Sequence, residues 1–249
     1  YELYSYWYYF YKYTGKFAVE NELGFQAIIK VLSTLNFPSE SLFWVIALLQ
    51  IFFLTKAIDR LAFLRGWYLF FFFTCLIFFV SMNVMRQTVA YFIFFWGYFY
   101  FLDRKYLKYA VIMLVGVLFH KTIIIPAVGG IFLRGEIFKK PFSLILLLIG
   151  GSYIFPLMLE IFFELIFPVV DFLGYGYYIK ALDLMKKITE ETIAGDGLSY
   201  FLFLVIDSLI IFYLPKLKHE FKYFIPFFNL YIIGALLSRV FVDNFVFLR

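Results

Sequence analysis

The apolar residues of this chain form long continuous runs instead of alternating with polar residues. A run such as "GWYLFFFFTCLIFFV" (66–80) approaches the length of about 20 residues that a helix needs to cross a bilayer. Strands are not expected, because a half-buried strand or a membrane β-barrel would show a period of two. The pattern predicts membrane-spanning helices at about 41–58, 66–83, 85–102, 141–173, 198–214 and 223–240.

Two further apolar segments do not fit a single straight span. Residues 24–36 predict a helix of roughly 20 Å, shorter than a bilayer core of about 30 Å, which would dip in or pack against neighbours. The stretch 106–133 is too long for one straight helix, and His120 and Lys121 interrupt its middle. We therefore predict two short arms that meet near the histidine.

Together these patterns predict an all-α polytopic membrane protein. It would have roughly eight spans plus short re-entrant or interfacial helices, all within one integral-membrane domain over residues 1–249. The chain starts without methionine and ends within an apolar pattern. We therefore expect it to be a fragment that lacks N-terminal helices. Whether it also lacks C-terminal helices stays open at this point.

Composition agrees with a membrane protein and narrows the chemistry. Hydrophobic residues make up 64% of the 249 residues, and the net charge of +5 comes with basic connecting loops, so it does not indicate nucleic-acid binding. The single cysteine, Cys75, lies in an apolar run and provides neither a disulfide nor a thiolate metal site. No His, Cys or carboxylate cluster has metal-ligand spacing, so we expect a metal-independent mechanism without a cofactor.

The loop charges predict the orientation of the chain. Four short connections are rich in lysine and arginine, which places them in the cytoplasm: 56–65, 103–108, 134–140 and 215–222. If 106–133 enters and leaves and 141–173 crosses once, the remaining polar positions lie on the outer face: residues 1–23, Arg86, His120, the loop 174–197 and Arg239. The sequence thus predicts an outer polar cleft for a substrate with an anionic head and a lipid tail.

The stretch "SMNVMRQTVA" (81–90) places Arg86 and Gln87 between two apolar runs. A charge beside hydrocarbon costs several kcal/mol unless it is paired or faces a polar cavity, so Arg86 indicates a functional site. The alternative is an interfacial arginine that extends toward lipid headgroups. Asp207, inside another apolar run, must also face protein or water, for instance by pairing with a lysine or arginine.

Residues 82–127 resemble the EpsG family of bacterial exopolysaccharide and O-antigen polymerases, also called Wzy-like proteins. In that family an Arg-Gln-x-x-Ala helix precedes a basic turn and then Phe-His-x-Ser/Thr. These positions are here Arg86, Gln87 and Ala90, then Arg104, Lys105 and Lys108, then Phe119, His120 and Thr122. "ENELGF" (20–25) is similar to the family's acid-containing helix entry, and "LSRVFVDNF" (237–245) to its late arginine-containing helix, with Glu22 and Arg239 at the matching positions.

The resemblance implies a membrane glycosyltransferase with a GT-C-like helical bundle. It would join oligosaccharide repeat units carried on undecaprenyl pyrophosphate at the outer side of the bacterial inner membrane. The growing glycan would pass from its lipid to a sugar hydroxyl of the next unit, giving exopolysaccharide, capsule or O-antigen. The implied partners are the lipid-linked glycan and the bilayer. A chain-length regulator is a third partner that the resemblance allows but does not require.

Residue chemistry suggests a role for the arginines. The leaving lipid pyrophosphate gains negative charge, and a guanidinium group offers planar donors that stay charged. Arg86 and Arg239 are therefore candidates to bind it, with Gln87 beside them, and Arg86 is also a catalytic candidate because a fixed cation lowers the barrier.

The acceptor hydroxyl would benefit from a positioned base. His120 can take a proton near neutral pH, and Glu22 is the competing carboxylate. Tyr175 and Tyr178 could stack on sugar rings, although anchoring at the membrane interface would also explain them.

Two other functions stay open at this point. A membrane acyltransferase that modifies polysaccharide also combines histidine and arginine within the membrane, but it needs an acyl-donor path from the cytoplasm, and no polar residues suggest one. A non-catalytic flippase for the same glycan should have cationic residues through the depth of the membrane, whereas here they gather at the predicted outer ends.

Overall fold

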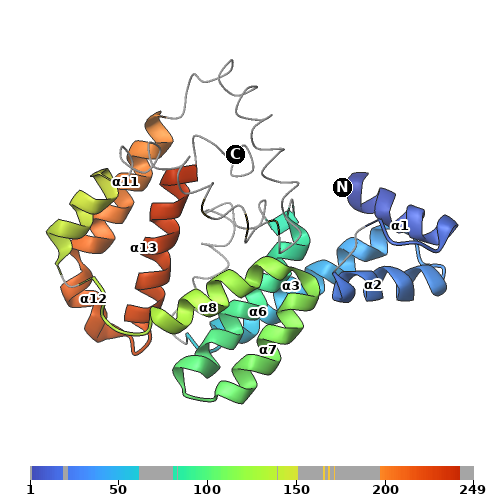
Figure 1. The fold of residues 1–249 in the computed structure, drawn as a ribbon, viewed down its shortest axis with the longest axis horizontal. Coiled ribbons are helices and arrows are strands. Elements are labelled where there is room, and N and C mark those ends of the chain that lie inside the picture. Colours follow the sequence, from blue (N-terminus) through green and yellow to red (C-terminus); the bar gives the residue numbers. More distant parts are fainter. Residues whose placement is uncertain are drawn as a thin grey trace. The chain divides into compact units, whose positions relative to one another are not determined.

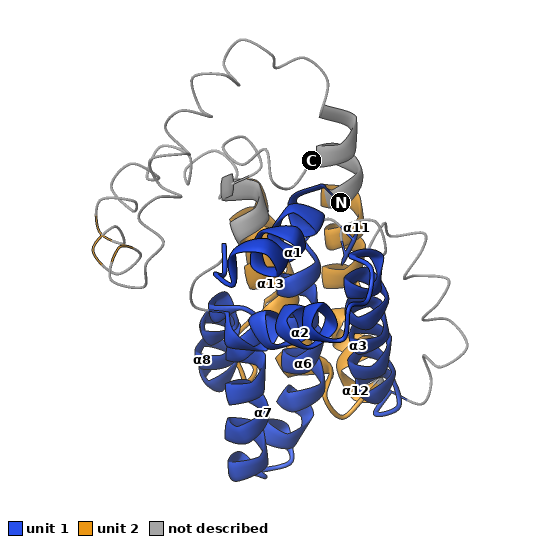
Figure 2. Ribbon diagram, turned by 90° about the vertical axis from the view of Figure 1, so that its right-hand side faces the viewer, with its two compact units in different colours: residues 1–132 blue, residues 133–249 orange. Residues whose placement is uncertain are grey.

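The computed structural model describes residues 2–18, 22–61, 81–82, 84–138, 140–150, 165, 168, 171 and 197–241. Helices joined by turns make up this described part of the chain, and it contains no strand, as the sequence predicted. The chain divides into two compact units, residues 1–132 and 133–249 (Figure 2). A single integral-membrane domain stays a prediction.

The first unit begins with a helix that hydropathy alone did not predict. The segment 2–14 is aromatic and polar and has no apolar run, yet it forms a regular helix with Tyr4 and Tyr8 buried. The other helices match the predicted ranges closely. In chain order the unit contains α1 (Glu2–Thr14), α2 (Leu23–Thr34), α3 (Glu40–Ile58), α6 (Met85–Leu102), α7 (Tyr106–Phe119), the short 3-10 turn η2 (Lys121–Ile123) and α8 (Ile124–Phe132) (Figure 1).

The predicted break at His120 is present. His120 has extended backbone angles (φ −160°, ψ 122°) between α7 and η2. After this break, α8 packs beside α6 and α7. The Tyr98 hydroxyl on α6 donates to the Gly130 carbonyl at 2.9 Å, and the Tyr109 hydroxyl on α7 donates to the Ala127 carbonyl at 2.8 Å. The segment 106–133 thus reverses direction at the histidine, as the predicted topology requires.

An ion pair joins the C-terminal ends of α3 and α6. Arg60 donates to the Asp103 carboxylate and lies over the rings of Phe99 and Tyr100, at 5.7 and 5.9 Å from its Cζ to the ring centroids. The next residue, Arg104, has a φ of 62°, in the left-handed region that strains residues with a side chain. Arg86 starts the same helix, about 25 Å away at 1.5 Å per residue.

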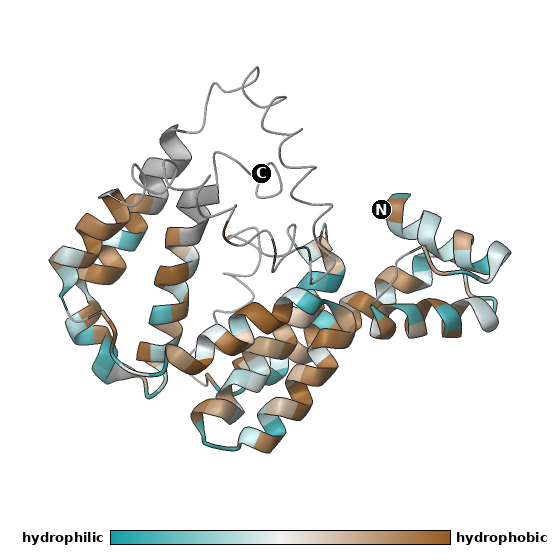
Figure 3. Cartoon of the chain, in the orientation of Figure 1, coloured by the Kyte–Doolittle hydropathy of each residue, from teal (hydrophilic) through white to brown (hydrophobic). Residues whose placement is uncertain are grey.

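Apolar residues make up much of α3 and α7 (Figure 3), and several of their large side chains are exposed. On α3 these are Trp44, Leu48 and Ile51, exposed by 73%, 65% and 58%, and on α7 they include Leu107 and Leu114, exposed by 80% and 66%. A soluble monomer rarely exposes such contiguous apolar surface, so these faces are suited to contact with lipid.

One described helix, α3, has both the length and the hydropathy of a membrane span. Several described apolar helices are shorter, among them α2, α7 and Pro141–Gly150. The predicted span at 66–83 and much of 141–173 lie outside the described residues. Roughly eight spans in a GT-C-like bundle therefore stay a prediction.

The second unit contains Pro141–Gly150, α11 (Gly197–Phe212), α12 (Leu214–Glu220) and α13 (Phe224–Phe241). The segment 215–222 was expected to be a basic connection, and most of it lies in helix α12. Pro215 in the first turn favours this helix, because the fixed φ of proline suits a helix start. The unit packs around an apolar core: Leu144, Leu148, Ile211, Leu214, Phe228 and Ile232.

Two polar side chains are buried in this unit. Asp207, only 3% exposed, faces protein as expected and accepts a hydrogen bond from the Tyr231 hydroxyl, while pairing with a basic residue stays a prediction. Asn229, 1% exposed, donates to the carbonyls of Leu133 and Gly135, both at 2.7 Å. Asn229 therefore holds the chain segment that leads into Pro141–Gly150.

Candidate functional site

The start of α6 is held in place by a buried amide. Gln50, 4% exposed on α3, donates from Nε2 to the carbonyls of Ser81 and Met85, each at 3.2 Å. These carbonyls flank the break at Val84 that precedes Arg86. Sequence reasoning missed Gln50, although a lone amide inside an apolar span would have been a usable signal.

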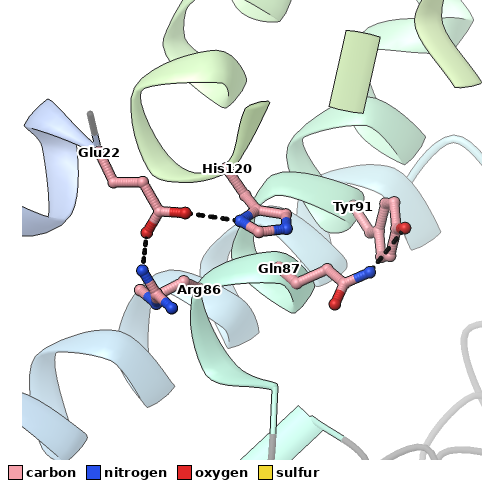
Figure 4. Close-up of polar contacts among 5 residues, drawn as sticks. All are labelled: Glu22, Arg86, Gln87, Tyr91 and His120. Atoms are coloured by element: carbon pink, nitrogen blue, oxygen red, sulfur yellow. Dashed lines mark hydrogen bonds and ion pairs between the residues drawn. The ribbon is translucent and has the colours of Figure 1, made fainter. Parts of the chain in front are cut away.

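Glu22 lies between Arg86 and His120. Its Oε2 accepts a hydrogen bond from Arg86 Nη1, and its Oε1 lies 2.7 Å from His120 Nδ1 (Figure 4). The Glu22 side chain is 8% exposed, and those of Arg86 and His120 are 15% exposed. A buried carboxylate is costly unless it is paired and hydrogen-bonded, and here both of its oxygens have partners.

A glycine explains how Glu22 and His120 come so close. The start of α2 packs directly against the last turn of α7, where a Cβ added at Gly24 would lie 3.1 Å from the Leu118 carbonyl oxygen. Glu22 stands just before Gly24, and His120 just after Leu118. The close backbone contact thus brings the carboxylate to the imidazole.

Replacing Gly24 by alanine is expected to lower the stability of the protein by about 1–3 kcal/mol, because the new methyl group meets a backbone atom that cannot turn aside. Thermal unfolding of the purified protein measures this. Gly129→Ala is the matched control, since nothing lies within 4 Å of a Cβ at that position. Equal unfolding midpoints for the two variants would contradict the close contact.

The pairing with Glu22 assigns the protons of His120. Glu22 accepts through Oε1, so Nδ1 carries the hydrogen and Nε2 of a neutral ring is left with a lone pair. Nε2 has no hydrogen-bond partner among the described residues, and Figure 4 shows it turned away from the carboxylate. His120 is therefore arranged to accept a proton through Nε2.

Arg86 lies among aromatic rings. Its Cζ is 4.5 Å from the ring centroid of Trp7, 5.4 Å from that of Phe25 and 5.9 Å from that of Tyr4. A guanidinium above such rings gains cation–π attraction, so the positive charge is stabilised even where it is largely shielded from water. Sequence reasoning missed Trp7 and Tyr4, because α1 was not predicted as a helix.

The other predicted site residues are placed as follows. Gln87 donates to the Tyr91 hydroxyl one turn along α6, at 2.8 Å, and makes no bond to Glu22 (Figure 4). Arg239 lies on α13 in the second unit, and only its place in that helix is described. Tyr175 and Tyr178 lie outside the described residues. The structure thus brings together Glu22, Arg86 and His120, while the roles assigned to them stay predictions.

Within the described ranges, no group of three or more His, Cys, Asp or Glu residues could hold a metal ion. The cluster of Glu22, Arg86 and His120 instead combines a fixed cation with an imidazole that a carboxylate orients. Such a set can stabilise developing negative charge and accept a proton in the same step.

Comparison with known proteins gives one match over the whole chain. The sequence model of the EpsG family matches residues 1–249. Curated proteins and solved structures provide no match.

Proposed function

The chain belongs to the EpsG family of Wzy-like polysaccharide polymerases, which are membrane proteins, and on that premise we propose that it polymerises repeat units linked to undecaprenyl pyrophosphate. The growing glycan passes from its lipid carrier to a hydroxyl of the next lipid-linked unit. The reaction takes place at the outer side of the bacterial inner membrane, within a GT-C-like bundle.

The observation that carries this proposal is the Glu22 carboxylate shared by Arg86 and His120. In the proposed step, the acceptor hydroxyl gives its proton to His120 Nε2 while its oxygen bonds to the anomeric carbon. The bond from that carbon to the phosphate oxygen breaks, and its electron pair leaves with the lipid pyrophosphate. Arg86 stabilises the charge that this departure creates.

The geometry supports His120 over Glu22 as the base. Both carboxylate oxygens of Glu22 are already hydrogen-bonded, one to each neighbour, whereas His120 Nε2 has no described partner. Glu22 then acts as a positioning residue that fixes the ring and its tautomer, in the way a buried carboxylate orients a catalytic imidazole. Arg86 in turn fixes Glu22.

Charge placement supports a polymerase over a flippase. Along α6 the ionic contacts are at the two ends, Arg86 with Glu22 and Asp103 with Arg60, and the helix between them has no charged residue. A pathway for moving a pyrophosphate through the membrane would need cationic groups between these ends. The polymerase needs them only where the chemistry takes place.

Purified full-length protein in lipid nanodiscs, given its lipid-linked repeat unit alone, tests the function directly. We expect a ladder of lipid-linked oligomers with release of undecaprenyl pyrophosphate. Movement of the repeat unit across vesicles without oligomers would support the flippase instead. Acyl transfer from an added donor, without oligomers, would support the acyltransferase.

Cysteine labelling tests the proposed orientation. In a Cys75→Ala background, a membrane-impermeable maleimide on intact cells should label Lys16→Cys, which follows α1, and not Lys105→Cys in the basic turn after α6. Both lysines are exposed, so they form a matched pair. Labelling of Lys105→Cys alone would place the Glu22 cluster on the cytoplasmic side.

A further inference from the structure

Three aromatic rings lie together on one side of the Arg86 guanidinium. The rings of Tyr4, Trp7 and Phe25 meet edge to face, with interplanar angles of 79° for Tyr4 and Trp7, 72° for Tyr4 and Phe25, and 80° for Trp7 and Phe25. Their centroids are 5.1, 5.8 and 6.1 Å apart in the same order. Rings that pack edge to face at these distances make a well-defined support for the guanidinium, which we call the aromatic cage.

The three rings do not contribute equally. Tyr4 is 7% exposed and Phe25 is fully buried, so both belong to the apolar core of the first unit whatever Arg86 does. Trp7 is only partly buried, and its centroid is the nearest to the Arg86 Cζ, at 4.5 Å. Trp7 is therefore the cage member that lies nearest to the guanidinium and is the least buried.

The cage limits how Arg86 can be approached. The aromatic rings cover one side of the guanidinium, and Glu22 takes the hydrogen bond from Nη1. The remaining N–H groups of Arg86 have no hydrogen-bond partner among the described residues. A planar guanidinium held in this way offers a fixed N–H edge to an anion, and this edge matches the spacing of phosphate oxygens.

We propose that Trp7 is a positioning residue that, with Tyr4 and Phe25, holds Arg86 so that its free N–H edge meets the phosphate oxygens of the leaving pyrophosphate. This inference rests on the proposed function for the identity of the anion. It also gives α1, a helix without an apolar run, a role in the site, because Tyr4 and Trp7 lie on this helix. Trp7 itself touches Arg86 and does not need to touch the substrate.

Binding of inorganic pyrophosphate to the full-length protein in nanodiscs, measured by calorimetry, tests this role without requiring polymerisation. Trp7→Leu should weaken binding about tenfold, because leucine fills space without a ring quadrupole, and Trp7→Phe should weaken it about threefold. Trp44→Leu, which removes a tryptophan that is 73% exposed on α3, should leave the affinity unchanged. Tryptophan fluorescence should change when pyrophosphate is added to the wild type and to Trp44→Phe, because both keep Trp7. It should not change when pyrophosphate is added to Trp7→Phe.

A double-mutant cycle separates positioning from a general loss of structure. In an Arg86→Gln background, Trp7→Leu should have no further effect on the affinity, since the cage would have no cation to hold. An unchanged affinity of Trp7→Leu, or an equal loss in both backgrounds, would overturn the role of Trp7 and leave the polymerase proposal standing. A wild type that makes oligomers yet does not bind pyrophosphate would also overturn it.

Discussion

Replacing Arg86 by alanine in the intact protein is expected to abolish polymer, while single lipid-linked repeat units accumulate outside the cell. The variant loses the cation that, in the proposed step, stabilises the departing pyrophosphate, and removal of one such preorganised group lowers turnover by about a thousandfold. The measurement is the chain-length distribution of cell-surface glycan together with the amount of unpolymerised lipid-linked unit. Normal chain lengths would remove Arg86 from the reaction.

This experiment needs a control for the carboxylate that Arg86 leaves behind. The Glu22 side chain is 8% exposed, and it keeps only the His120 contact when Arg86 is removed. Loss of one partner of a buried ion pair destabilises a protein by up to about 3–5 kcal/mol. Arg86→Ala combined with Glu22→Ala removes that penalty, so it should restore the amount of folded protein without restoring polymer. Arg60→Ala is a matched arginine loss at the other end of α6 and should retain polymerisation.

Replacing His120 by alanine is expected to lower turnover by about 10²–10⁴-fold while the protein still binds the lipid-linked unit. The variant lacks Nε2, which takes the proton of the acceptor hydroxyl in the proposed step. Single-turnover kinetics in nanodiscs measure the rate, and equilibrium binding of the lipid-linked unit measures the affinity. His219→Ala, at an exposed position on α12, is the matched control and should leave the rate unchanged.

Two further variants decide between His120 and Glu22 as the base. His120→Gln keeps a donor for Glu22 but removes the basic nitrogen, so it should be as slow as His120→Ala. Glu22→Gln should be less severe, because it weakens the orientation of the ring and leaves the base in place. If Glu22→Gln costs more turnover than His120→Ala, then Glu22 is the base.

Most of the described helices could be predicted from the sequence, because a long apolar run that enters a membrane must satisfy its backbone hydrogen bonds internally, as a helix does. The ranges of α2, α3, α6, α11 and α13 all follow from hydropathy, and the break at His120 follows from two polar residues in the middle of an overlong run. By contrast, α1 has tyrosines on every side, and only its packing on the rest of the unit shows which ones are buried.

The site could be predicted as a set of residues but not as an arrangement. The resemblance to the EpsG family pointed to Arg86, His120 and Glu22, three positions on separate segments. Which of them pair depends on the close backbone contact at Gly24 and on the amide of Gln50, and neither has a signature in the order of residues. The hydrogen bonds of Glu22 therefore add a reason to favour His120 as the base that the order of residues does not contain, and the role itself stays a prediction.

Arg104 has a strained backbone in the basic turn after α6, and the proposed topology gives a reason for a charged residue there. At a φ of 62° a residue with a side chain costs about 1–2 kcal/mol, and glycine would fit this turn without strain. On the proposed topology, the positive charge of Arg104 is used before the folded turn exists, when the insertion machinery reads lysines and arginines to orient each hairpin. The strain that Arg104 keeps in the folded protein would then follow from its part in membrane insertion. On this topology, the side of the membrane that Glu22, Arg86 and His120 face is set before these three residues come together.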